Sequence, residues 1–144
     1  VKMKKRVDRR LRRAPSITTP DLDELCINTV RFLEVDAVQQ ANSGHPGVPL
    51  DMMPMACVLW DRFLKYHLGD LGWPDQDWFV LSAGHTSAML YACLHLTGYD
   101  LPLEELKQFR QWESRISSHP EYGLIPGAEV TSACPVLRLH PRRR

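Results

Sequence analysis

Several common signatures are missing from this sequence, and each absence argues against a class of protein. No apolar run is long enough to cross a bilayer, and no charged start followed by an apolar stretch marks a secretory signal. The four cysteines have no CxxC spacing, and three of them lie in apolar segments. These features predict a protein without a membrane partner, with buried free thiols, in a reducing compartment such as the cytoplasm.

Catalytic signatures with a fixed local spacing are missing too. The chain has no HExxH pair, no serine nucleophile elbow and no glycine-rich dinucleotide loop. A structural zinc site with locally spaced ligands is therefore not indicated, and a catalytic zinc site assembled from distant residues stays open as a minority interpretation.

The small net charge of +1 conceals a partition along the chain. Residues 1–13 carry eight Lys or Arg and one Asp, and four further Arg lie in the last seven residues. The stretch between them has 6 basic and 16 acidic residues, which would repel a phosphate backbone. We therefore predict basic disordered tails at 1–17 and 133–144 and no nucleic-acid partner. Contact of the first tail with nucleic acid or anionic lipid is the open alternative.

The 144 residues, 44% hydrophobic and 24% charged, suit one globular domain, which we place at 18–132. The first predicted helix opens with Thr18-Thr19-Pro20-Asp21 and ends before Asn42. Helices at 54–66, 86–97 (stopped by Gly98) and 102–109, and a buried strand at 78–81, follow. This order predicts the α/β class, with helices and few parallel strands. The first helix is predicted to pack through Leu22, Leu25, Cys26, Thr29, Leu33 and Ala37.

Three histidines lie in short loops that contain glycine or proline. The loops are Ser43-Gly44-His45-Pro46-Gly47, Ala83-Gly84-His85-Thr86 and Ser118-His119-Pro120-Glu121. Glycine lets the backbone approach a ligand closely, and imidazole changes its protonation nearest neutral pH. Three such rings in similar settings predict one polar reaction site.

His85 has the most specific surroundings, because a strand, a tight turn and a helix are predicted around it. Unpaired N–H groups and a partial positive charge make a helix N-terminus suitable for phosphate or diphosphate. Ser82, Thr86 and Ser87 lie beside His85 and could add hydroxyl groups. The alternative is that His85 only caps its own helix, and the spacing does not decide between the two.

The other histidines are less specific when taken singly. His45 alone fits a rigid turn with an exposed ring, and near His119 the Glu121 carboxylate could orient the ring or be solvated. His67 and His95 fall near helix ends, where surface or packed histidines are expected. His45, His85 and His119 therefore gain their significance from occurring together.

Long stretches of this chain, covering roughly residues 20–132, resemble the opening part of the transketolases in order and spacing. The first is Asp36-Ala37-Val38-Gln39-Gln40-Ala41-Asn42-Ser43-Gly44-His45-Pro46-Gly47. The others are 58–60, 79–85, 94–102, 104–111 and 119–121.

The resemblance implies a thiamine diphosphate-binding domain in an enzyme that uses thiamine diphosphate and Mg²⁺. Such an enzyme transfers a two-carbon ketol unit between sugar phosphates in the pentose phosphate pathway, with the cofactor supplying the carbanion chemistry. By position, His85 is the expected cofactor-binding residue. His45 and His119 are the expected catalytic residues near the reactive carbon, and His45 also binds substrate hydroxyls. Arg110 falls in a matching stretch and is interpreted as structural.

The chain departs from the family in three respects. Ile116-Ser117-Ser118 stands where the family usually has Thr-Pro-Gly, which puts the aim of His119 in question. After Ser132 the family's glycine-rich segment is replaced by an arginine-rich ending, as reading a GC-rich gene out of frame would produce. The family's metal-binding motif is absent, and Gly69-Asp70-Leu71 is only superficially similar.

We therefore expect a truncated transketolase segment that is inactive alone. Family members are homodimers, and a homodimer or a second polypeptide is the expected partner, besides the sugar phosphates. One alternative is half of a split transketolase that requires that second polypeptide. The other is a noncatalytic fragment, or an interaction module that acts through its basic tails.

Overall fold

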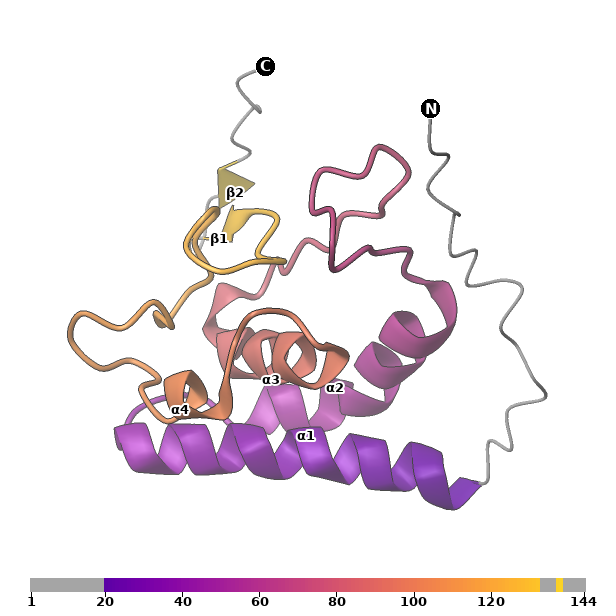
Figure 1. Cartoon of the computed structure of the whole chain (residues 1–144). Coiled ribbons are helices and arrows are strands. Elements are labelled where there is room, and N and C mark those ends of the chain that lie inside the picture. Colours follow the sequence, from indigo (N-terminus) through magenta and orange to yellow (C-terminus); the bar gives the residue numbers. More distant parts are fainter. Residues whose placement is uncertain (1–19, 133–136, 139–144) are drawn as a thin grey trace.

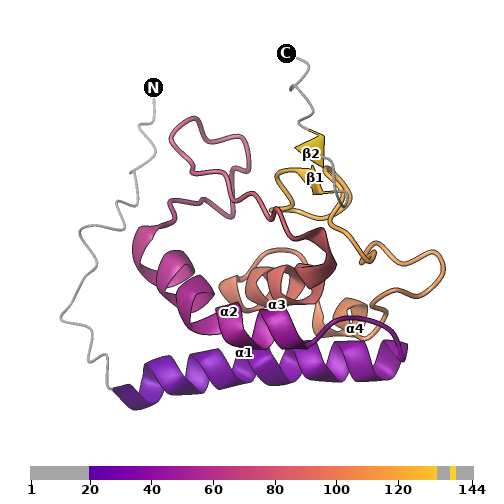
Figure 2. The ribbon, with the colours of Figure 1, turned by 180° about the vertical axis from the view of Figure 1, so that it is seen from behind.

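A computed structural model describes residues 20–132 and 137–138, and the elements within them are mostly helical. The longest helix, α1, lies along one side of the molecule, and α2 and α3 pack on it (Figures 1 and 2). The short strands lie on the side of the molecule away from α1. The elements are α1 (Pro20–Ala41), α2 (Gly47–Val58), η2 (Leu59–Phe63), η3 (Gly84–Thr86), α3 (Ser87–Thr97), α4 (Leu103–Leu106), β1 (Thr131–Ser132) and β2 (Leu137–Arg138).

The first predicted helix is confirmed as α1, but its predicted buried face is partly wrong. Val30, Glu34 and Ala37 are buried, whereas Leu25 is 62% exposed and Phe32 68% exposed. The buried face lies about a quarter turn from the predicted one, at 100° of rotation per residue. Apolar residues occur on both faces, so periodicity alone could not choose between them. Of the predicted set, Ala37 is buried, Leu33 is partly buried against the core, Thr29 is partly exposed, and Leu22, Leu25 and Cys26 are exposed. The predicted cap at Thr18-Thr19 lies outside the described residues.

The second helix begins at Gly47 and not at Pro54, which lies inside α2. Proline has no N–H, so the carbonyl of Leu50 loses the helical partner it would have at residue 54. Arg31 of α1 supplies a substitute, because its Nε donates to the Leu50 carbonyl oxygen at 2.9 Å. The helix then widens into the π-helical turn η2, which ends at Phe63 and not at Tyr66.

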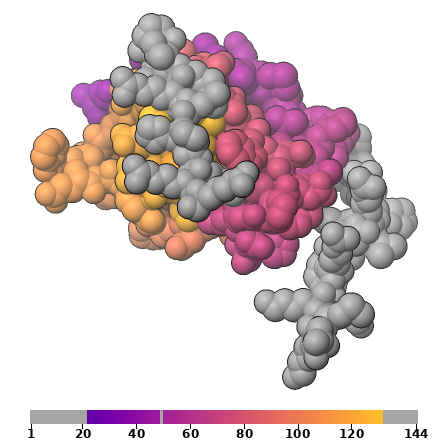
Figure 3. Space-filling view, turned by 90° about the horizontal axis from the view of Figure 1, so that it is seen from above, coloured from indigo at the N-terminus to yellow at the C-terminus, as the bar shows by residue number. Residues whose placement is uncertain are grey.

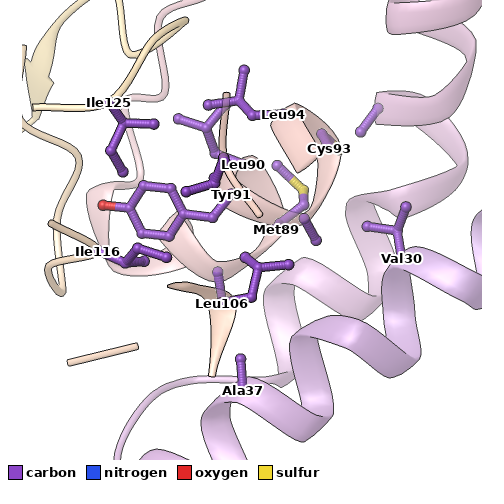
Figure 4. Close-up of a cluster of buried hydrophobic side chains, with 14 of the residues drawn as sticks. Val30, Ala37, Met89, Leu90, Tyr91, Cys93, Leu94, Leu106, Ile116 and Ile125 are labelled. Atoms are coloured by element: carbon purple, nitrogen blue, oxygen red, sulfur yellow. The ribbon is translucent and has the colours of Figure 1, made fainter. Parts of the chain in front are cut away.

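The third predicted helix is confirmed, with the 3-10 turn η3 leading into α3. Gly98, at φ 91°, ends it as predicted, and the Tyr99 N–H donates to the Leu94 carbonyl at 3.1 Å. Eight of the eleven residues of α3 are buried, because α1, α2 and α4 pack around it (Figure 4). The fourth helix is shorter than predicted: α4 covers Leu103–Leu106, and turns follow it.

The predicted strand at 78–81 is wrong for the described chain. These residues form no strand, and although Leu81 is buried, Trp78 is 46% exposed and Val80 39% exposed. A strand needs a neighbour to complete its hydrogen-bond ladder, and within residues 20–132 and 137–138 the only ladder is β1 with β2. That pair is antiparallel, so the expected parallel strands are not formed here and the α/β class stays a prediction.

The two tails fall almost entirely outside the described residues. The exception is β2, whose two residues lie in the second predicted tail and pair with β1. The prediction of buried thiols is confirmed for Cys93, whereas Cys57 is half-buried, Cys26 is exposed and Cys134 is not described. Across the described part of the chain, no helix has the length and apolar character to span a membrane.

Candidate functional site

His45 and His85 come from separate loops and meet. Their ring centroids lie 5.4 Å apart with the planes at 72°, an edge-to-face arrangement. His45 is exposed in the turn between α1 and α2, and His85 is half-buried in η3. The structure therefore brings together two of the three predicted histidines at the N-terminal end of α3.

The turn that carries His45 depends on Gly44. Its φ of 142° lies in the region that L side chains rarely adopt, and a Cβ there would lie 2.9 Å from Val38 Cγ2. Only glycine allows the backbone to approach α1 this closely. The preceding Asn42 is left-handed as well, with φ 48°. These two residues turn the chain sharply after α1 and place His45 against His85.

The hydroxyl groups beside His85 are already used inside the protein. Thr86 Oγ1 donates to the Ala83 carbonyl at 2.7 Å, and Ser87 Oγ donates to the Ser118 carbonyl at 2.8 Å. His85 itself has no hydrogen-bond partner among the described residues, so its ring does not cap the helix. Of the polar side chains predicted for a phosphate, the His85 ring keeps its nitrogens free, whereas Thr86 and Ser87 serve the fold.

His119 is held next to the same end of α3. Ser87 and Tyr91, one turn apart on the helix, donate to the backbone carbonyls of Ser118 and Ser117 at 2.8 and 3.1 Å. Burial raises the pKa of Tyr91 to about 12, so its hydroxyl stays protonated as a donor. Because α3 also follows directly from His85, all three histidine loops adjoin one helix end.

The His119 ring is oriented by a serine and not by Glu121. Ser118 Oγ lies 3.2 Å from His119 Nδ1, and Ser117 Oγ donates to the His119 carbonyl oxygen. Glu121 is exposed, as its solvated alternative predicted. The two serines that replace the family's usual proline and glycine thus form a hydrogen-bonded loop. His119 Nε2 is buried and has no partner among the described residues.

No metal centre accompanies the histidines within the described residues, where no three His, Cys, Asp or Glu side chains are grouped to hold an ion. Asp70 Oδ1 accepts a hydrogen bond from the Gly72 N–H at 3.1 Å, so it closes a local turn. His95 is packed, with Nδ1 2.8 Å from the Leu101 carbonyl oxygen, and His67 is exposed. These histidines behave as predicted.

The environments of two polar residues were not predicted from the sequence. Glu34 is fully buried in the helical core, and its two carboxylate oxygens have no hydrogen-bond partner in the described part of the chain. Burial raises its pKa to about 8. Arg110 donates from Nη1 to Ser43 Oγ at 2.7 Å, across 67 positions of sequence. No local pattern could reveal either feature.

Comparison with known proteins agrees with this arrangement. The profile of the family described as "Transketolase, thiamine diphosphate binding domain" matches residues 22–136. The chain therefore belongs to the transketolase family.

Individual relatives agree as well. The chain is 53% identical to a transketolase of Halalkalibacterium halodurans over 111 residues, which are 77% of this chain and 17% of that protein. It is 58% identical to transketolase 2 of Escherichia coli over 105 residues, which are 73% of this chain and 16% of that protein. This chain thus spans about one sixth of the length of these relatives.

Solved structures show the same likeness. The transketolase of Leishmania mexicana superposes with a TM-score of 0.74 at 48% identity, covering 77% of this chain and 17% of that one. A Pichia stipitis transketolase in complex with sedoheptulose 7-phosphate superposes with a TM-score of 0.75 at 48% identity, covering 78% and 16%. The helical arrangement around α3 is therefore that of the matching part of a transketolase.

Proposed function

We propose that this chain provides the histidine-bearing part of a thiamine diphosphate site for two-carbon ketol transfer between sugar phosphates. The observation that carries the proposal is the gathering of three histidine loops at one end of α3, with the His45 and His85 rings 5.4 Å apart. Family membership supports the cofactor, and the sugar phosphate bound by the Pichia stipitis relative supports the substrate class.

The described residues fit part of the cofactor. His85 lies where α3 begins, with free ring nitrogens and the partial positive charge of a helix N-terminus beside it, which suits a diphosphate oxygen. Thiamine diphosphate, when bound, supplies the carbanion that attacks the ketose carbonyl. The described residues offer no ligand set for Mg²⁺, so its binding is not assigned to them.

His45 and His119 are the residues we propose to contact the substrate. The exposed His45 ring is accessible to the hydroxyl groups of a sugar phosphate. His119 Nε2 is buried without a partner, so a substrate oxygen would satisfy it and be stabilised as it gains negative charge.

The isolated chain is proposed to be inactive, because its described residues lack the metal ligands that would offset the diphosphate charge. A second polypeptide would supply the metal ligands that the described residues do not offer, and the chain would pair with a second copy of itself in a homodimer. The assembled enzyme would operate in the cytoplasm as part of the pentose phosphate pathway. Calorimetry of the full chain with thiamine diphosphate and Mg²⁺ tests whether the chain alone binds the cofactor. We expect no measurable binding, and micromolar affinity would contradict the proposal.

A chimera tests the histidine roles directly. Residues 22–132 of this chain replace the corresponding segment of the Escherichia coli relative, to which it is 58% identical. We expect a chimera that binds thiamine diphosphate and transfers ketol units, with His85→Ala weakening cofactor binding. His45→Ala and His119→Ala should lower the rate instead, by about 10²–10³-fold as is typical for lost acid–base or oxyanion groups. His67→Ala is the matched control. A folded, cofactor-loaded chimera without ketol transfer would refute the proposal.

A further inference from the structure

Arg110 connects two of the histidine loops. Its Nη1 donates to Ser43 Oγ at 2.7 Å, in the turn that carries His45. Its backbone N–H donates to the Ile116 carbonyl oxygen at 2.9 Å, three residues before His119. A fully buried Ile116 fixes the position of that carbonyl. Arg110 thus contacts both the His45 turn, 67 positions away at Ser43, and the chain before His119, six positions away at Ile116.

The conformation of Arg110 is costly for its residue type. Its φ of 59° is left-handed, where glycine or asparagine is the usual choice at the end of a helical turn. Its Nε is also buried and has no partner among the described residues. Left-handed backbone in a non-glycine residue is strained, and an unsatisfied buried donor adds a desolvation cost. A glycine would make the turn without either cost, so the turn alone does not explain the arginine.

The bond to Ser43 explains the choice of side chain. Ser43 lies between the left-handed Asn42 and Gly44, the two residues that turn the chain after α1. Phe109, next to Arg110, is 3.5 Å from the position that a Cβ on Gly44 would take. The guanidinium also lies 5.5 Å from the centroid of the Phe109 ring. Phe109 and Arg110 therefore both lie against the turn that carries His45.

We propose that Arg110 is a positioning residue that fixes His45 against His85 by holding Ser43. The inference rests on the proposed function for its consequence, since it assigns to Arg110 the placement of a substrate-contacting ring. Arg110 acts through Ser43 and does not itself contact the reacting atoms. The structural interpretation of Arg110 is thereby given a specific form, a link from the chain after α4 to the His45 turn.

The test uses the full chain and observes the histidine rings by NMR, so it is independent of ketol transfer. The readout is the ring-to-ring NOE between His45 and His85, whose centroids are 5.4 Å apart. We expect Arg110→Ala and Ser43→Ala each to abolish this cross-peak, and the double variant to show no further change. Arg110→Lys, which keeps one cationic donor, should restore part of it. Arg115→Ala is the matched control, because Arg115 pairs with Glu105 and not with the turn.

Each outcome decides the question. Loss of the cross-peak in Arg110→Ala and Ser43→Ala, but not in Arg115→Ala, supports the proposal. An unchanged cross-peak in either folded variant, or an equal loss in Arg115→Ala, overturns it. If Arg110→Ala does not fold, the variants Ser43→Ala and Arg110→Lys decide the question. Both keep a long side chain at the left-handed position 110. If the chimera is inactive but the His45–His85 cross-peak still depends on Arg110 and Ser43, the proposed function is refuted and the role of Arg110 is retained.

Discussion

The helix α3 and residues 64–82, which precede it in the sequence, differ in burial and in secondary structure. In α3 eight of eleven residues are buried, whereas the preceding segment is irregular chain with short turns, and its Trp78 and Val80 are exposed. Figure 3 shows the segment on the face away from α1, beside the residues that precede β1, and Gln76 Nε2 donates to Glu129 Oε1 at 3.1 Å. Both stretches are rich in apolar residues.

The difference lies in how each backbone completes its hydrogen bonds. A helix pairs its own N–H and C=O groups, so α3 needs only side chains around it, and α1, α2 and α4 provide them. A strand at 78–81 would need another strand beside it, and none is formed beside these residues in the described part of the chain. Strand-forming residues are therefore necessary for a strand without being sufficient.

The largest expected effect removes packing from the helical side of this comparison. Leu94→Ala should lower the free energy of unfolding by about 4 kcal/mol, because Leu94 is 1% exposed at the centre of the core. Val80→Ala should lower it by less than about 1 kcal/mol, since Val80 is 39% exposed. Urea unfolding followed by circular dichroism measures both. Equal losses would mean that the segment 64–82 is as much part of the core as α3.

The second effect is a pH dependence centred on Glu34. Its pKa is about 8 in the folded chain against an ordinary value of 4.5. Between these pH values the unfolded chain releases the proton and the folded chain keeps it, so stability falls as pH rises and levels off above about 8. Glu34→Gln should remove this slope and gain on the order of 4 kcal/mol at pH 8 relative to the parent.

The exposed Glu24 on the same helix provides the control for that measurement. Glu24→Gln should leave the pH dependence of unfolding unchanged. A parallel slope in the Glu34→Gln variant and the parent between pH 5 and 8, a window of about 3 pH units, would show that Glu34 is ionised in the folded chain.

The third effect separates packing from backbone strain at the C-terminal end of α3. Gly127 and Gly123 share a left-handed φ, 86° and 83°. A Cβ on Gly127 would lie 2.6 Å from Leu94 Cδ2, whereas nothing lies within 4 Å of one on Gly123. Gly123→Ala should therefore cost about 1 kcal/mol and Gly127→Ala about 2 kcal/mol or more. Thermal unfolding compares them, and identical shifts would contradict the packing at Gly127.

The smallest effect concerns the exposed segment itself. Two hydrogen bonds join Lys65 and Asp77 and so hold the ends of the loop 65–77 together. The Lys65 N–H donates to Asp77 Oδ2 at 2.9 Å, and the Asp77 N–H donates to the Lys65 carbonyl at 2.8 Å. Asp77→Ala should cost about 1 kcal/mol or less and act locally. Limited proteolysis should cut within 65–77 faster, with global unfolding nearly unchanged. Asp75→Ala, which removes only a surface ion pair, is the control.

The sequence predicted most reliably what is encoded locally. The start of α1 at Pro20, the end of α3 at Gly98 and the three histidine loops all depend on residues a few positions apart. The buried face of α1 was missed because apolar residues such as Phe32 occur on its exposed side as well. The strand at 78–81 was predicted wrongly because a strand also needs a partner strand beside it, which its own residues do not reveal.

The candidate site divides in the same way. The histidines and the glycine turn around His45 could be identified from short motifs. Their placement depends on Ser87 and Tyr91 reaching the 117–118 carbonyls and on Arg110 reaching Ser43. These hydrogen bonds span 26 to 67 positions, and no periodicity or motif predicts them.

The single bond from Arg31 to the Leu50 carbonyl has a consequence for the geometry of the His45 turn. By making Pro54 acceptable inside a helix, it allows α2 to start at Gly47, directly after the turn. The span of chain free to move between α1 and α2 is therefore limited by a side chain in the middle of α1. The positions available to His45 are thus limited by Arg31, a residue of α1 that lies outside the three histidine loops.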